Sequence, residues 1–490
     1  MKKEKKGNTD IMKENILEKR YNLLLGLLTA VAAVMYLLLC QGDLVWMDEA
    51  YTFGMIRRSY SEMCSITALD VHPPLYYIML KAFATPFTNK LLAGKIFAVI
   101  PYVIIMIFGG IQLKKLFNAK TGLSFGVLFF FFPFMLSYAA EVRMYSWAAL
   151  FVFINAVYAY RAYLYNTKKD WILYTIFGLS AAYTHYFAVA SAAVIYGWLL
   201  LCAIIKKREL VKPWLITAAV TVILYLPWLR FFVEQLKYKI DNEYWIEPIT
   251  LKTFKTYFTD IFSAESNMAM ALVIALASAV MLFFGIKSRK DRTISLIGIS
   301  VPVLTLVLGM AASFIIRPVF VIRYLLPSVP LFIVSMAIGT ANINKKVPTL
   351  ILTGIIVVVG IVSYSTAYYD RNTHFDGRMD DAFYERNRDC DAYIVTIDRN
   401  DIHPGHTETV LAYYETEKDI YQVVENYGYY PFENFRYIGD FDSDKYERVI
   451  ILVASGKEIP KEYRDDYTYE YRETTTSLWI PADVYIMTRK

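Results

Sequence analysis

Apolar runs of about twenty residues recur along the chain as far as residue 368. A run of 18 or more apolar residues has the length of a transmembrane helix, because about 20 residues cross the hydrocarbon core of a bilayer. We expect eleven such segments, at residues 21–40, 91–111, 123–140, 146–164, 171–188, 189–205, 213–232, 267–286, 294–316, 325–343 and 348–368. The pattern therefore predicts an α-helical polytopic membrane protein.

Basic residues are distributed unevenly between the two sets of loops. Alternating the spans from a cytoplasmic N-terminus places 23 Lys and Arg in the inner segments, whereas the outer loops are longer and poorer in basic residues for their length. This distribution satisfies the positive-inside rule. Residues 1–20 are then a cytoplasmic segment, and the first span lacks a cleavage-site pattern, which predicts that it stays uncleaved.

The stretch 50–90, in the first outer loop, is too polar to span a membrane. It combines "TFGMIRRSYSEMCSITAL", which has mixed amphipathic spacing, with the aromatic stretch "PPLYYIMLKAFATPF". Tyr and Trp favour the membrane–water interface. We therefore expect short helices that lie along the outer interface.

The pattern changes after residue 369. Short strand-like runs recur at 392–397, 419–424, 448–454 and 483–489, with one helical pattern at 406–417. Strands that alternate with helices favour a small α/β domain. The predicted domains are therefore a transmembrane domain at 21–369 and, by span parity, an extracytoplasmic α/β domain at 370–490.

Composition supports a membrane protein. Of the 490 residues, 56% are hydrophobic and 20% are charged, against roughly 25% charged in average soluble chains. The net charge of +6 comes from short basic clusters between apolar runs. Such clusters are explained by membrane topology, and they do not indicate a nucleic-acid partner. The four cysteines show no C-x-x-C spacing, so the sequence supports neither a zinc site nor a disulfide framework. Cys64 and Cys390 fall in the same compartment, and whether they form a bridge stays open.

The stretch "WMDEAYTFGMIRRS" places Asp48 and Glu49 where the first span leaves the membrane on the outer face. Arg57 and Arg58 follow, and then "LDVHPPLYY" adds Asp70, His72 and Tyr76. Two adjacent carboxylates can take different catalytic roles: one acts as a general base, and the other orients an acceptor or a metal. An interfacial helix cap is the alternative for the acid pair. Asp70 and His72 also suit a divalent metal, although no third ligand is evident.

Basic and aromatic residues gather at outer span ends as well. Arg143 and Tyr145 lie in "EVRMYSW", His185 in "YTHYF", and Arg317, Arg323 and Tyr324 in "RPVFVIRYLLP". The planar guanidinium suits a phosphate ester, although arginine also snorkels to lipid phosphate. For His185, two interpretations are open: a histidine at a helix end and a residue of the substrate site.

Acids that activate a hydroxyl, together with cations that hold a lipid phosphate, favour one reaction class. This class is transfer of a sugar from a polyprenyl phosphate to an acceptor outside the cytoplasm. The base deprotonates the acceptor hydroxyl, the hydroxyl attacks the anomeric carbon, and arginine stabilises the leaving phosphate.

These motifs resemble the bacterial protein-O-mannosyltransferase-like branch of the GT-C glycosyltransferases, glycosyltransferase family 39. The resemblance covers roughly residues 20–345 and rests on "WMDE", "DVHPPLYY", "EVRMY", "THYF" and "RYLLP" in this order. It implies a GT-C fold, a polyprenyl-phosphate-sugar donor and inversion at the anomeric carbon. It also implies Asp48 as the catalytic acid position, Glu49 as its partner, and location in a bacterial plasma membrane.

The acceptor stays open among a protein hydroxyl, a lipid and a cell-wall glycan, and so does the sugar. The main rival function is a transporter or flippase of lipid-linked sugars. Transporters usually carry polar residues at mid-span and internal repeats, whereas these spans are nearly free of acids and show no repeat. A non-catalytic scaffold would leave the loop acids unexplained.

The topology predicts that the C-terminus lies outside the cytoplasm. A reporter enzyme that is active only outside the cytoplasm, fused after Lys490, should therefore be active. A tag at Lys490 that resists external protease in intact spheroplasts would contradict the eleven-span topology.

Overall fold

The chain folds into two compact units. The computed structural model describes residues 2–42, 45–241, 246, 248–263, 267–372, 383, 386–387, 389–396, 406–423, 431–475 and 482–490. Met1–Cys40 and Lys95–Tyr368 form one unit, here called the helical unit. Gln41–Gly94 and Tyr369–Lys490 form the other, here called the mixed unit. The first outer loop thus shares a compact unit with the C-terminal segment, whereas the sequence-based boundary grouped it with the spans.

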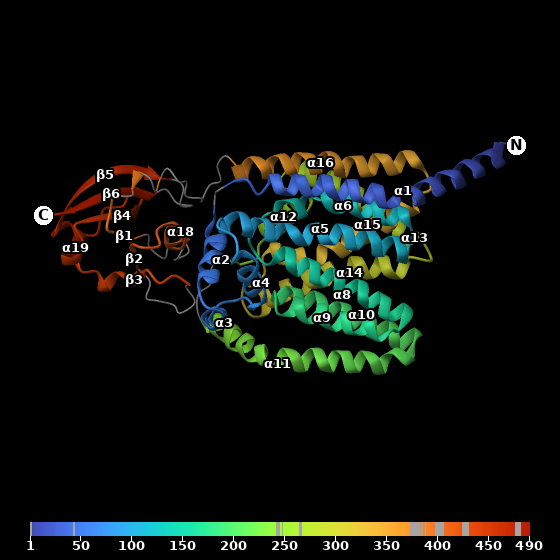
Figure 1. Cartoon of the computed structure of the whole chain (residues 1–490), viewed down its shortest axis with the longest axis horizontal. Coiled ribbons are helices and arrows are strands. Elements are labelled where there is room, and N and C mark those ends of the chain that lie inside the picture. Colours follow the sequence, from blue (N-terminus) through green and yellow to red (C-terminus); the bar gives the residue numbers. More distant parts are fainter. Residues whose placement is uncertain are drawn as a thin grey trace. The chain divides into compact units, whose positions relative to one another are not determined.

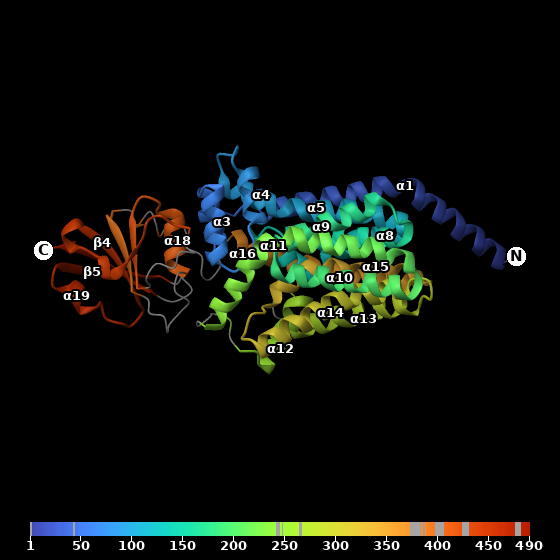
Figure 2. The same cartoon turned by 90° about the horizontal axis from the view of Figure 1, so that it is seen from below.

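The helical unit consists of long, roughly parallel helices (Figures 1 and 2). They are α1 Lys2–Leu38, α5 Lys90–Leu116, α6 Ala119–Phe131, α7 Pro133–Ser137, α8 Tyr145–Tyr165, α9 Lys168–Ala182, α10 Tyr186–Lys206, η1 Arg208–Leu210, α11 Val211–Asp241, α12 Leu251–Phe262, α13 Met268–Lys287, α14 Arg292–Ile315, η2 Ile322–Ser328, α15 Val329–Asn342 and α16 Lys346–Asn372. Nine helical stretches in the described part are long and apolar enough to cross a membrane. The expected polytopic membrane fold is confirmed.

Two predicted spans are shorter than expected. The segment at 123–140 is α6, with 13 residues, followed by the short α7. Pro133 separates them, because proline lacks the N–H that a continuing helix needs and fits the first turn of a new one. The segment at 171–188 is α9, with 15 residues, which ends at Ala182 shortly before α10 begins. At each break, non-helical backbone lies between the end of one helix and the start of the next.

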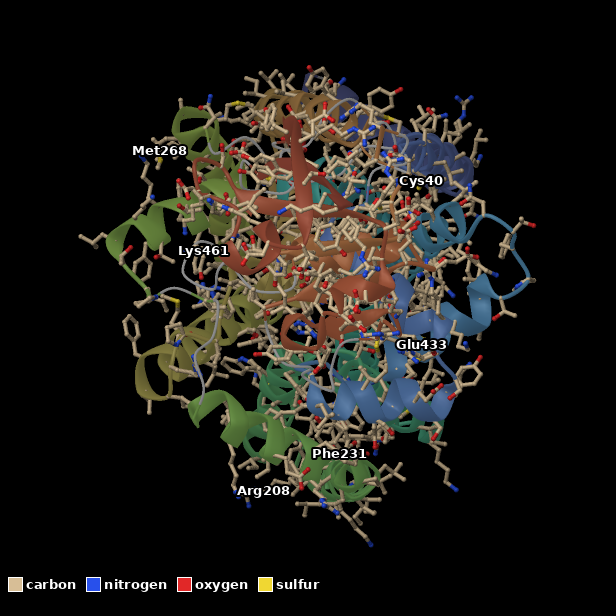
Figure 3. All side chains as sticks on the ribbon, turned by 90° about the vertical axis from the view of Figure 1, so that its left-hand side faces the viewer. Cys40, Arg208, Phe231, Met268, Glu433 and Lys461 are labelled. Carbon is tan, nitrogen blue, oxygen red and sulfur yellow. The ribbon has the colours of Figure 1, made fainter. Side chains whose placement is uncertain are left out.

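Small residues allow close helix packing inside the bundle. A Cβ at Gly339 of α15 would lie 1.7 Å from the carbonyl oxygen of Met281 in α13, and one at Gly298 of α14 would lie 2.7 Å from that of Leu331. Such close backbone approach is how membrane helices gain packing energy where lipid is as apolar as the side chains. The outer surface of the bundle, by contrast, carries large apolar side chains. Figure 3 shows Phe231 of α11 and Met268 of α13 at the edge of the bundle, and α11 exposes Leu215, Ile216 and Ile223.

Three short helices follow the first span, as the sequence predicts. They are α2 Met47–Arg57, α3 Tyr60–Leu69 and α4 Leu75–Ala84. Ser59 and Glu62 form a reciprocal capping box at the start of α3, and Pro73 and Pro74 separate α3 from α4. All three helices belong to the mixed unit.

The rest of the mixed unit is built on a six-stranded mixed sheet. Its strands are β1 Ala392–Val395, β2 Asp419–Gln422, β3 Phe435–Tyr437, β4 Arg448–Ala454, β5 Tyr467–Thr475 and β6 Ala482–Arg489, in the order β3-β2-β1-β4-β6-β5. Strands β1 to β4 pair in parallel, and β6 runs antiparallel to both β4 and β5. Helices α18 His406–Tyr414 and α19 Lys461–Arg464 complete the unit.

The predicted α/β domain is therefore confirmed, with two strands more than the pattern indicated. The predicted strands correspond to β1, β2, β4 and β6, and residues 397 and 424 lie outside the described residues. Strand β5 lacks an apolar run because most of its side chains are exposed at the sheet edge. Its neighbours supply the core, in which Ile394, Ile451 and Met487 are completely buried.

Candidate active site

The predicted acid pair lies on the first turn of α2. Glu49 is completely buried, and its carboxylate accepts a hydrogen bond from the backbone N–H of Trp46 at 3.4 Å. Asp48 is half-buried, and its carbonyl oxygen accepts a hydrogen bond from the Thr52 hydroxyl at 2.8 Å. Carboxylates at a helix N-terminus are stabilised by the helix dipole and by free N–H groups. Glu49 thus serves as a cap, and Asp48 is the more accessible acid of the pair.

The second predicted motif forms a compact group between α3 and α4. The Nδ1 atom of His72 lies 3.4 Å from Oδ2 of Asp70, and His72 is buried. Tyr76 is completely buried and packs edge-on against Tyr77, whose ring also approaches Tyr51 of α2. Among the residues that the structure describes, no three His, Cys, Asp or Glu side chains group as metal ligands. Cys64 and Cys390 are not joined by a disulfide.

Basic side chains bind the C-terminal ends of two helices in the mixed unit. Arg57, in the last turn of α2, donates hydrogen bonds to the carbonyl oxygens of Ala412 and Tyr413 at 3.3 and 2.9 Å. These carbonyls belong to the last turn of α18. Lys81 of α4 in turn donates to the carbonyls of Ile56 and Arg58, at 2.9 and 2.6 Å. A cation at a helix C-terminus satisfies open carbonyls and complements the dipole.

The next residues extend this attachment between α2 and the C-terminal segment. Arg58 donates from Nε to the carbonyl of Pro431 at 2.6 Å and forms an ion pair with Glu433. A Cβ at Gly54 would lie 2.7 Å from Pro431 and 2.8 Å from the ring of Phe432. The helix that carries Asp48 and Glu49 is therefore packed directly on the C-terminal segment. The substrate-binding role of Arg57 and Arg58 stays a prediction.

The helical unit brings three predicted residues from distant segments into one aromatic cluster. The rings of Tyr145, His185 and Tyr324 lie 4.9–6.4 Å apart, centroid to centroid. All three are buried. Phe187 stacks on Tyr324 at 5.2 Å and contacts Phe320 edge-on. Aromatic pairs at such distances prefer offset or edge-to-face contact, and here they join α8, α10 and η2.

His185 serves as the N-cap of α10. Its Nδ1 accepts a hydrogen bond from the backbone N–H of Phe187 at 3.1 Å, and the side chain is only 2% exposed. An imidazole nitrogen that accepts a hydrogen bond carries no proton, so this geometry selects the neutral ring with its proton on Nε2. Both interpretations of this residue therefore meet: it caps a helix and keeps a neutral hydrogen-bond donor in the cluster.

The predicted arginines flank this cluster. Arg143 is buried in the turn before α8, where its backbone N–H donates to the carbonyl of Glu141 at 2.7 Å. Arg323 lies in η2 beside Tyr324, and Arg317 lies earlier in the loop that joins α14 to η2.

Asp260 is a candidate that the sequence analysis missed. It lies on α12, and burial raises the pKa of its carboxyl to about 6. The neighbouring Tyr257 donates a hydrogen bond to the carbonyl of Phe320 at 2.8 Å, which ties α12 to the aromatic cluster. A carboxyl that titrates near pH 6 suits proton transfer near neutral pH. The available signal was a single acid among aromatic residues in "TYFTDIF".

Lys95 is a second missed candidate. It lies in α5, near the end that follows the first outer loop, and its side chain is 2% exposed. Lysine is almost never fully buried unless it is paired, and ionisable residues within spans mark functional sites by default. The signal was one lysine within the apolar run "LLAGKIFAVI".

Two solved structures share the fold. ArnT from Cupriavidus metallidurans in the apo state superposes with a TM-score of 0.62 at 10% identity, covering 94% of this chain and 97% of that chain. The same protein bound to undecaprenyl phosphate gives a TM-score of 0.60 at 9% identity, with the same coverage. No protein-family model matches the chain, and no curated protein matches it in sequence.

The fold implied by the sequence motifs is thereby confirmed, since this chain shares the fold of ArnT. The match covers nearly the whole of both chains, so it includes the spans and the C-terminal α/β segment. The protein-O-mannosyltransferase branch receives no specific support from these comparisons.

The packing of α2 on the C-terminal segment predicts a specific sensitivity at Gly54. Gly54→Ala should loosen this contact, because a Cβ there would overlap Pro431 and Phe432; overpacking typically costs about 1–3 kcal/mol. Amide hydrogen exchange of α2 and α18 should accelerate. Gly197→Ala is the matched control, since a Cβ there meets nothing within 4 Å. Unchanged exchange in Gly54→Ala would show that the contact adds no stability.

Proposed function

We propose that this protein is a membrane glycosyltransferase. It transfers a sugar, with inversion, from a polyprenyl-phosphate-linked donor to an acceptor on the outer face of the plasma membrane. The observation that carries the proposal is an acid pair on the first turn of a helix in the first outer loop of a GT-C fold. One of the solved proteins with this fold binds undecaprenyl phosphate, which supports a polyprenyl phosphate carrier here.

The two acids have different roles in this proposal. Glu49 is buried and holds the backbone of Trp46, so it orients the start of α2. Asp48 is half-buried, whereas Glu49 is completely buried, so we assign the role of general base to Asp48. Asp48 takes the proton from the acceptor hydroxyl while that oxygen attacks the anomeric carbon, and the sugar–phosphate bond breaks from the opposite face.

The leaving lipid phosphate needs cationic and neutral donors. Arg143 and Arg323 supply guanidinium groups that match phosphate geometry. The neutral His185 adds an N–H donor without adding charge. Donors that are fixed before the reaction stabilise the developing negative charge without reorganisation.

The rival function, a flippase of lipid-linked sugars, needs polar groups along a path through the bilayer. The ion pair of Arg161 with Asp170, at 2.8 Å, joins the end of α8 to the start of α9. That ion pair therefore stabilises a helix connection at one end of the spans. A transferase needs only a carboxylate and cations at one membrane face, which is the arrangement that the motifs predict.

The donor site yields the first functional prediction. Arg143→Ala and Arg323→Ala should each weaken binding of a polyprenyl phosphate, because loss of a charged hydrogen bond costs about 1.5–3 kcal/mol. That cost corresponds to about 10- to 150-fold in Kd. Arg464→Ala is the control, since Arg464 pairs with Glu458 in the C-terminal segment. Donor affinity that stays at the level of the control in both variants would exclude these arginines from the donor site.

Asp48 yields the second functional prediction. Asp48→Asn keeps the size of the side chain but removes its basicity. Turnover in nanodiscs with a polyprenyl-phosphate sugar should fall at least about a hundredfold, since positioned acid–base catalysis is worth roughly 10²–10⁴. Donor binding should persist. A panel of protein, lipid and glycan acceptors provides the readout, with donor hydrolysis as a second assay.

The control for Asp48→Asn is Asp465→Asn, an exposed carboxylate of the C-terminal segment. Glu49→Gln should also impair turnover, through the start of α2. Full activity of Asp48→Asn would reduce the acid pair to an interfacial cap.

A further inference from the structure

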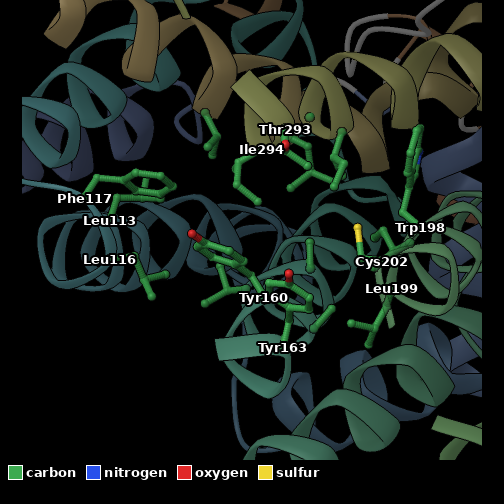
Figure 4. Close-up of a pocket in the computed structure, with 18 of the residues that line it drawn as sticks. Leu113, Leu116, Phe117, Tyr160, Tyr163, Trp198, Leu199, Cys202, Thr293 and Ile294 are labelled. Carbon is green, nitrogen blue, oxygen red and sulfur yellow. The ribbon is translucent and has the colours of Figure 1, made fainter. Parts of the chain in front are cut away.

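A cavity of about 260 Å³ lies between α5, α8, α10, α14 and α15 in the helical unit (Figure 4). Its wall is largely apolar and includes Leu113, Phe153, Ile195, Leu199, Ile297 and Val334. The close-up shows Tyr160 and Tyr163 on one side and Thr293 and Ile294 across from them. The volume lies just below the roughly 300–1,000 Å³ of drug-sized pockets, so the cavity fits a segment of a hydrocarbon chain.

Positive charge gathers at one end of this cavity. Lys206, the last residue of α10, and Lys290, directly before α14, both line the cavity and are otherwise exposed. Tyr160, Tyr163 and Thr293, which carry hydroxyl groups, line the cavity as well. Lys206 and Lys290 thus provide two ammonium groups beside an apolar space.

The other charged groups nearby leave these two lysines available to a ligand. Lys207 donates to the carbonyl of Tyr163 at 2.7 Å. Asp291, the acid next to Lys290, accepts hydrogen bonds from Ser288 and Asn342 at 2.9 and 3.0 Å. Both hydrogen bonds reach Oδ2, so this oxygen is held by side chains other than Lys290. Lys206 and Lys290 take part in none of the ion pairs of the described residues.

The charged end of the cavity belongs to the face that basic residues assign to the cytoplasm. Lys206 begins the inner loop "KKRELVK" and Lys290 lies in the inner loop "KSRKDR". The candidate active site is assigned to the opposite face by the same alternation. The cavity is therefore separate from the proposed chemistry, and an inference from it stands without the proposed function.

We propose that this cavity binds one acyl chain of an anionic phospholipid from the cytoplasmic leaflet. The chain fills the apolar space, which water would occupy poorly because few polar partners line it. The phosphate lies between Lys206 and Lys290, and the tyrosine hydroxyls donate to its oxygens. Basic pockets between transmembrane helices on the cytoplasmic side have the chemistry that anionic lipid head groups require.

Native mass spectrometry of the full chain tests this assignment. The protein is released from nanodiscs that contain equimolar phosphatidylglycerol and phosphatidylcholine, with undecaprenyl phosphate as a third component in a parallel sample. One phosphatidylglycerol should remain bound in preference to phosphatidylcholine. The preference should fall about fivefold for each of Lys206→Gln and Lys290→Gln, and tenfold or more for the double variant, from the contribution of a single basic residue near a membrane surface.

Two further variants make the test specific. Arg208→Gln with Arg289→Gln removes the same charge from the same two loops, at exposed residues that do not line the cavity, and should leave the preference unchanged. Ala156→Phe fills the cavity and should release phosphatidylglycerol. Equal losses in the two double variants, displacement of phosphatidylglycerol by undecaprenyl phosphate, or no retained phosphatidylglycerol would each overturn the proposal.

Discussion

A bilayer offers the peptide backbone no hydrogen-bond partner, and the rest of this structure depends on that constraint. The spanning segments are therefore helices, and the polar side chains that chemistry needs lie where these helices end or break. Pro133 interrupts one span, and Thr184 and His185 separate α9 from α10. The aromatic cluster of Tyr145, His185 and Tyr324 forms at such breaks, because irregular backbone there exposes groups that side chains can cap.

Helix ends also explain how the mixed unit holds its acids. The carbonyls at the end of α18 accept hydrogen bonds from Arg57, and those at the end of α2 accept them from Lys81. Each contact satisfies open carbonyls with a positive charge, an arrangement that the helix dipole favours. Because Asp48 and Glu49 begin the helix that Arg57 ends, the C-terminal segment contributes to the position of the acids. This gives the segment a structural role beside any contact with an acceptor.

The same fold occurs in ArnT at about one identical residue in ten. A membrane bundle tolerates such divergence because its lipid-facing positions require only apolar side chains, and its buried contacts require small residues at a few close approaches. Gly339 and Gly298 are such positions here. Small residues at a few close approaches are thus enough to retain this packing at low identity.

The sequence by itself determined the spans, their predicted sidedness and the α/β character of the tail, since hydrophobic length, basic loops and strand patterns are local properties. It also singled out Asp48, Glu49, Tyr145, His185 and Tyr324. It missed the exposed edge strand β5, whose solvated side chains leave no apolar pattern, and it missed Lys95 and Asp260. Their significance comes from burial, which depends on neighbours far away in the chain. Only the tertiary structure joined Tyr145, His185 and Tyr324 in one cluster, and only it attached Arg57 and Arg58 to a segment about 350 residues later. Such contacts depend on how distant segments pack in the folded chain, and the local residue spacing does not specify that packing.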